Sequence, residues 1–145
     1  MIANIVELNE SDTTLYTLQL PSKLESLNLI ENFADTLKEK YGISEDIYAN
    51  ILICLSEVAS NAIVHGNKED EQKKVYINLE VHNNKLMIFT VSDEGEGFDY
   101  NILPDPTAPE NLENLAGRGI FIMKQLADQC IFNSSGNEIE LHFKI

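Results

Sequence analysis

The sequence predicts a single α+β domain of 145 residues, a two-layer sandwich in which helices cover one face of a mostly antiparallel sheet. Three observations predict this class. Apolar residues recur at helical spacing in three segments, and they alternate or run together in five strand-like segments. The 43% hydrophobic content also lets one core form without disulfides or metals.

The predicted fold starts with a strand and a helix. Residues 13–21 alternate apolar and polar side chains and end at Pro21, as a strand does. The segment that follows repeats apolar residues at helical spacing, and Ser22 with Glu25 fits a capping box. Gly42 then supplies the stop of this amphipathic helix.

A second helix begins at Ser44, where two acidic residues suit the positive end of a helix. It runs to about His65, before a Gly-Asn pair. Its apolar face consists of Ile47, Ile51, Leu55, Val58 and Ala62. We therefore expect this helix to pack on the sheet.

The second half of the chain completes the sheet. Strands at residues 73–82 and 85–93 are joined by an Asn-Asn turn, and the second strand is apolar enough to be central. Residues 95–115 are acidic, contain three prolines and show no periodicity, which is typical of a lid or binding loop. Helical spacing returns in residues 117–128, and residues 130–145 close the chain as a hairpin.

The composition limits the function. A formal charge of −14, from 24 acidic and 10 basic residues, argues against direct nucleic-acid binding, which needs clustered Lys and Arg. A small nucleotide is still allowed, because backbone N–H groups and one or two cations can hold its phosphates. Cys54 and Cys130 fit no ligand spacing and are predicted to be reduced core thiols. The chain has no signal-peptide pattern and no segment long enough to span a bilayer, so we expect a cytoplasmic protein without membrane contact.

Polar side chains recur along the second helix. Because four residues advance an α-helix by about 40°, one narrow stripe beside the apolar face would point into a cleft: Asn50, Glu57, Asn61 and His65. The alternative is a solvated helix margin, in which Glu57 and Asn61 bond each other.

Two glycine-containing segments are also candidates. In "SDEGEGFD", Gly95 and Gly97 allow close backbone approach, and Asp93, at the end of a buried strand, needs a donor such as an NH₂ group. In isolation an ordinary acidic turn also explains this segment. In "AGRGI", glycines at a helix N-terminus expose backbone N–H groups and Arg118 adds a cation, which favours an anion site, although helices entered through glycines are common.

The order of these segments resembles the GHKL nucleotide-binding superfamily (Bergerat ATP-binding fold) of gyrase-type, chaperone, histidine-kinase and mismatch-repair ATPases. All three boxes of that superfamily are present between residues 57 and 119. The resemblance implies ATP and Mg²⁺ as cofactors, with the following roles: Asn61 for Mg²⁺, Asp93 for the adenine amino group, Gly95 and Gly97 for the lid hinge, and Gly117 and Gly119 beside the phosphates.

Within the superfamily, the chain is most similar to the small anti-sigma factor serine/threonine kinases. This likeness covers nearly the whole length and implies an ATP lid at about residues 98–117 of a single domain, residues 1–145. It also implies three protein partners: a sigma factor or related regulator, a small anti-sigma antagonist protein, and a second copy in a homodimer.

Phosphoryl transfer needs a metal ligand, a cation for the developing charge and a group that receives the hydroxyl proton, roles that suit Asn61, Arg118 and Glu57. His65 is interpreted as a helix C-terminal imidazole, and Lys68 as a solvated side chain rather than a phosphate ligand. One departure concerns the closing hairpin, where the family often carries Gly-Thr and this chain reads Gly136-Asn137. Asn137 could replace the threonine hydroxyl, or the alignment could instead use Ser134 or Ser135.

The predicted function is an anti-sigma type serine/threonine protein kinase that binds Mg-ATP, phosphorylates a small antagonist and sequesters a sigma factor. The main alternative is a nucleotide-gated regulatory binding protein of the same fold, in which Glu57 is structural and no phosphate is transferred. A plain acidic structural domain is a third reading.

Overall fold

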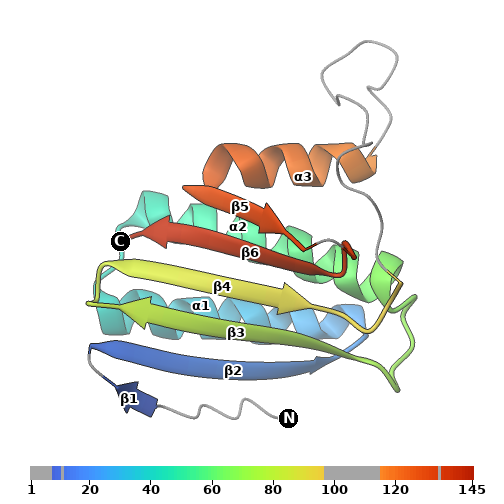
Figure 1. Cartoon of the computed structure of the whole chain (residues 1–145), viewed down its shortest axis with the longest axis horizontal. Coiled ribbons are helices and arrows are strands. Elements are labelled where there is room, and N and C mark those ends of the chain that lie inside the picture. Colours follow the sequence, from blue (N-terminus) through green and yellow to red (C-terminus); the bar gives the residue numbers. More distant parts are fainter. Residues whose placement is uncertain (1–7, 11, 97–114, 134) are drawn as a thin grey trace.

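The computed structural model describes residues 8–10, 12–96, 115–133 and 135–145, with backbone alone for residues 8–10 and 115–118. Six antiparallel strands in the order β1-β2-β3-β4-β6-β5 form one sheet (Figure 1). Their bounds are β1 Leu8–Glu10, β2 Thr13–Pro21, β3 Lys74–His82, β4 Leu86–Ser92, β5 Gln129–Phe132 and β6 Glu138–Lys144. The apolar strand β4 is central, as its composition predicts.

Local sequence explains the strand pairing. Asn83 and Asn84 both adopt left-handed backbone, with φ of 52° and 56°, and so close the β3–β4 hairpin. Along β4, side chains alternate between buried and half-buried positions, so one face of the sheet is covered and the other is more open to solvent.

Three α-helices are present in the described ranges: α1 Leu27–Tyr41, α2 Glu45–Asn61 and α3 Leu115–Leu126. Gly42 ends α1 in left-handed backbone at φ 61°, and the Ser44 side chain caps α2 by accepting the Ile47 N–H at 3.3 Å. In Figure 1, α1 and α2 lie behind the sheet, and α3 lies above β5 at the edge of the sheet.

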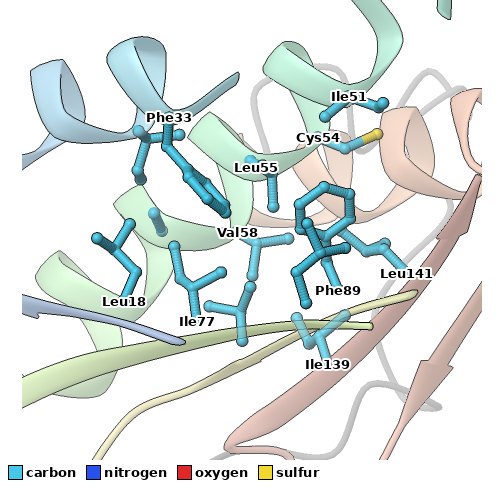
Figure 2. Close-up of a cluster of buried hydrophobic side chains, with 14 of the residues drawn as sticks. Leu18, Phe33, Ile51, Cys54, Leu55, Val58, Ile77, Phe89, Ile139 and Leu141 are labelled. Carbon is cyan, nitrogen blue, oxygen red and sulfur yellow. The ribbon is translucent and has the colours of Figure 1, made fainter. Parts of the chain in front are cut away.

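One hydrophobic core fills the space between the helices and the sheet (Figure 2). Phe33 of α1 and Leu55 and Val58 of α2 face the buried side chains of the strands. Phe89 on β4 and Phe143 on β6 pack edge to face, with ring centroids 6.0 Å apart. The predicted fold class, α+β with helices on one face of an antiparallel sheet, is confirmed.

Several boundaries differ from the sequence prediction. The capping box is wrong: a short 3-10 helix, Leu24–Ser26, precedes α1, and the Ser22 hydroxyl donates instead to the Lys73 carbonyl at 2.7 Å. The strand β1 was not predicted. The helix α3 begins at Leu115, slightly before the predicted start at residue 117, so Gly117 and Gly119 lie inside its first two turns.

The segment Glu45–Gly66 is long and apolar enough to cross a bilayer by length and composition alone. Its side chains Cys54, Leu55 and Ala59 are nevertheless fully buried against the rest of the protein. This segment therefore occupies the position of a core helix.

Candidate functional site

The end of α2 carries the predicted polar stripe. Asn61 is the last residue of α2, and the chain continues as a π-helical turn, Ala62–Gly66, which the Asn67 N–H closes by donating to the Ala62 carbonyl at 2.7 Å. Glu57 and Asn61 are both half-buried and lie one helical turn apart. Single π-turns occur often at functional sites, so the change of helix type makes this end of α2 a candidate for one.

Asp93 follows β4 directly and is half-buried. Its backbone N–H donates to the Asn137 carbonyl at 3.1 Å, and its Oδ1 accepts the Gly95 N–H at 2.7 Å. Burial raises the pKa of the Asp93 carboxyl, while the Gly95 hydrogen bond and the positive charge of Lys73 oppose that rise. The turn therefore holds a partly desolvated carboxylate that a hydrogen-bond donor would stabilise.

Two glycines pack directly on Asp93. A Cβ atom at Gly66 would lie 2.5 Å from Asp93 Cγ and 2.7 Å from Oδ1. A Cβ atom at Gly95 would lie 2.9 Å from the same oxygen and 2.7 Å from the carbonyl carbon of Gly66. The π-turn and the turn after β4 thus touch through their backbones, and only glycine fits at either position.

Gly119, from the glycine segment on α3, contacts the polar stripe on α2. A Cβ atom at Gly119 would lie 2.8 Å from Glu57 Oε2 and 3.5 Å from Asn61 Nδ2. The buried backbone of α3 therefore rests on the two polar side chains at the end of α2, at the same end of the molecule as the tip of β4 (Figure 1).

A cavity of about 340 Å³ lies between the end of α2 and the strand ends. Asn61 and Asp93 both line it, whereas Glu57 faces Gly119 and is absent from the described lining. His65 and Lys68, interpreted from sequence as a helix end and a solvated side chain, are exposed yet also line the cavity. Asn50 is half-buried and does not belong to the described lining, so the stripe reaches the cavity only at its C-terminal end.

Some cavity residues were missed by sequence reasoning: Gly66, Lys73, Val91, Glu94, Glu96 and Ile139. In the sequence Gly66 indicates only a helix stop, because no sequence pattern predicts a π-turn. Lys73 was read only as the start of a strand. Only the scarcity of cations in so acidic a chain could have drawn attention to Lys73, because it lies far from Asp93 in the sequence and comes near it only in the fold.

The closing hairpin contributes Gly136 and Asn137 to the cavity. Asn133 organises this turn, since its Oδ1 accepts the N–H groups of Gly136, Asn137 and Glu138 at 2.8, 3.1 and 3.2 Å. Of the residues considered for the family's threonine, Asn137 lines the cavity, Ser135 is not in the described lining, and Ser134 is outside the described residues.

Other predicted site residues lie beyond the described part of the chain. Gly97 and most of the predicted lid fall within residues 97–114, which are not described. Gly117 and Arg118 have helical backbone in α3, but the Arg118 side chain is not described. Residues 115–117, counted in the predicted lid, are helical.

The donor groups fit a magnesium nucleotide. Among the described residues, no three His, Cys, Asp or Glu side chains converge to hold a metal by themselves. Mg²⁺ is commonly held by one or two protein groups together with substrate phosphates, which suits the Asn61 amide. Beyond the Gly95 bond, the Asp93 carboxylate has further lone pairs that can accept from an amino group.

The fold and this site define a class of protein. Residues 20–143 match the family described as the histidine kinase-like ATPase domain, and the chain belongs to that family. The predicted superfamily is thereby confirmed.

Individual relatives narrow the class. The chain is 29% identical over 133 residues to the serine-protein kinase RsbW of Staphylococcus epidermidis, covering 86% of this chain and 82% of that protein. It is 27% identical over 126 residues to serine-protein kinase RsbW of Bacillus subtilis, covering 82% and 78%. A histidine kinase domain from a blue-light activated histidine kinase of Erythrobacter litoralis superposes on 85% of this chain and 60% of its own at 19% identity and a TM-score of 0.47. The predicted resemblance to serine kinases of the anti-sigma type is confirmed by the first two.

Proposed function

We propose that this protein is an ATP-dependent serine/threonine protein kinase of the anti-sigma factor type. It transfers the γ-phosphoryl group of ATP to a serine or threonine of a small antagonist protein, and it sequesters a sigma factor or a similar regulator. The observation that carries the proposal is the cavity with Asp93 and Asn61 in its lining, in a chain of the ATPase family and similar to serine-protein kinases.

The Asp93 carboxylate is proposed to accept a hydrogen bond from the adenine amino group. An adenine amino group donates hydrogen bonds, whereas guanine presents a carbonyl oxygen at the same position. The Asp93 carboxylate accepts the Gly95 N–H, and the Asp93 backbone N–H donates to the Asn137 carbonyl. Held in this way, the carboxylate would accept from the amino group of adenine and repel the carbonyl of guanine. The site therefore favours ATP over GTP.

The phosphates are proposed to lie toward Asn61 and the start of α3, where Gly119 packs closely against Glu57 and Asn61. Asn61 would hold Mg²⁺ there, and the ion would offset the negative charge of the phosphates. Gly117 and Gly119 would let the chain approach the phosphates, and Arg118 would supply a cation for the transition state. Lys68 and Lys73 line the same cavity and lessen the repulsion between a triphosphate and a chain of charge −14.

Glu57 is proposed to receive the proton of the acceptor hydroxyl. As the hydroxyl oxygen attacks the γ-phosphorus, its proton passes to the Glu57 carboxylate, and the bond to the bridging oxygen of the departing ADP breaks. Glu57 lies one turn from Asn61 and beside Gly119, so the proton acceptor and the metal ligand are neighbours.

The remaining features follow from the proposed class. The protein would act in the cytoplasm as a homodimer, with a single domain at residues 1–145, the hinge at Gly95 and Gly97, and the lid at about residues 98–117. A net charge of −14 disfavours direct contact with nucleic acid.

The test is phosphoryl transfer from labelled Mg-ATP to a candidate antagonist with an exposed serine. We expect Glu57→Ala to abolish transfer and to leave ATP binding, measured by calorimetry, within about threefold of the unmodified protein. Glu80→Ala is the matched control, because it removes the same charge from an exposed position on β3. Failure of the unmodified protein to bind Mg-ATP would refute the nucleotide site.

One observation favours a second candidate. Because Glu57 faces Gly119 rather than the described cavity, it could serve only to pack α3 on α2. The protein would then be a nucleotide-gated binding module without transferase activity. Normal transfer by Glu57→Ala would rule out our role for Glu57, and absence of transfer by the unmodified protein despite ATP binding would favour the binding module.

A further inference from the structure

A buried amide connects the site to segments that lie far from it in the sequence. Asn67 follows the π-turn and is only 1% exposed. Its Oδ1 accepts the Glu94 N–H at 2.8 Å, and its Nδ2 donates to Ser22 Oγ at 2.8 Å and to the Lys74 carbonyl at 2.9 Å.

These contacts use both donors and the oxygen of the amide, so the side chain has one orientation that satisfies it. The backbone N–H of Asn67 donates to the Ala62 carbonyl and closes the π-turn. One residue thus fastens the π-turn through its backbone and the turn after β4 through its side chain.

The Asn67 side chain is attached to the same turn that carries Asp93. Glu94 lies between Asp93 and Gly95, the residues whose carboxylate and N–H form the Asp-x-Gly turn. Holding the Glu94 N–H fixes that turn against the π-turn, where Gly66 touches Asp93. The next residues, Lys68 and Glu69, adopt left-handed backbone at φ 54° and 57°, a strained path that such a fastening can maintain.

We infer that Asn67 is a positioning residue that sets the adenine-reading geometry of Asp93. Asn67 is not in the described lining of the cavity, and it acts on the cavity wall through the Glu94 N–H. The inference rests on the proposed ATP site, and it assigns the selectivity of that site to a residue outside its lining.

Ser22 provides a matched control. It is fully buried, accepts from Asn67 Nδ2 and donates to the Lys73 carbonyl at 2.7 Å, and its hydrogen bonds in the described part of the chain do not reach the Asp93 turn. Ser22→Ala and Asn67→Ala both break buried hydrogen bonds and should both lower the melting temperature. Only Asn67→Ala releases the Glu94 N–H.

The experiment compares ATP and GTP binding by calorimetry in both variants. We expect Asn67→Ala to weaken ATP binding about tenfold and GTP binding less, so that selectivity narrows. We expect Ser22→Ala to keep both affinities within about twofold. Equal losses in the two variants, or unchanged ATP binding in Asn67→Ala, would overturn the inference by reducing Asn67 to a structural role.

A second measurement needs neither nucleotide nor variant. In the unmodified, nucleotide-free protein, the Glu94 amide should exchange its hydrogen well below the rate of an unstructured peptide, although the Glu94 side chain is exposed. Exchange at the unstructured rate would overturn the inference. If the amide is protected but the protein binds no ATP, the proposed function fails and the fastening by Asn67 stands.

Discussion

Substitution of Gly66 by alanine tests the contact between the π-turn and Asp93. The new Cβ would lie 2.5 Å from Asp93 Cγ, whereas an ordinary contact begins at 3.4 Å. The carboxylate would have to move by about 0.9 Å, which is enough to break its 2.7 Å bond to the Gly95 N–H. We expect ATP affinity to fall at least about tenfold and stability to fall by about 1–3 kcal/mol.

The matched control is Gly42→Ala at the end of α1. Its Cβ would meet nothing within 4 Å, but its φ of 61° strains any side chain, at a cost of about 1–2 kcal/mol. Urea melts should therefore show a loss of stability in both variants, and calorimetry with Mg-ATP should show lost affinity only in Gly66→Ala. Equal ATP affinity in the two variants would refute the argument that this glycine shapes the site.

Two further predictions concern titratable groups. Because burial raises the pKa of Asp93 above its unfolded value, ionising it costs stability, so its favourable contribution is present at acid pH and is lost as pH rises through the folded pKa. The stability of Asp93→Asn relative to the unmodified protein should therefore increase with pH, and a flat difference in urea melts would contradict this. Burial raises the pKa of Cys54 to about 12 and that of Cys130 to about 11. At pH 8 a thiol reagent should therefore label the fully buried Cys54 only after unfolding and the half-buried Cys130 more slowly than a free thiol; rapid labelling of Cys54 in the native protein would refute it.

Elements defined by local sequence were predicted well. The strand at residues 13–21 and the β3–β4 hairpin matched, because side-chain alternation and an Asn-Asn turn act over a few residues. The predicted capping box does not form because the Ser22 hydroxyl hydrogen-bonds Lys73 and Asn67 instead. Both partners lie far along the chain, so local sequence could not predict these bonds. The strand β1 was missed because the left-handed turn at Asp12, φ 65°, was not recognised as a hairpin signal.

The candidate site was predicted in part for the same reason. Asn61 and Asp93 lie at the ends of a regular helix and a regular strand, so their segments were readable. In the sequence Gly66 and Asn67 indicate only the end of a helix. The buried hydrogen bonds of Asn67 form only when its segment meets those of Ser22, Lys74 and Glu94 in the fold. The roles predicted for Asn61, Asp93, Glu57, Arg118 and the box glycines all stay predictions.

The cavity also has a consequence for folding kinetics. Its walls come from α2, the end of β4 and the start of β6. These segments lie far apart in the sequence, so we expect their contacts to form late in folding. Contacts that form after the folding transition state change the rate of unfolding and leave the rate of folding nearly unaltered. We therefore expect a nucleotide bound there to slow unfolding more than it speeds folding, which unfolding rates measured with and without Mg-ATP would test.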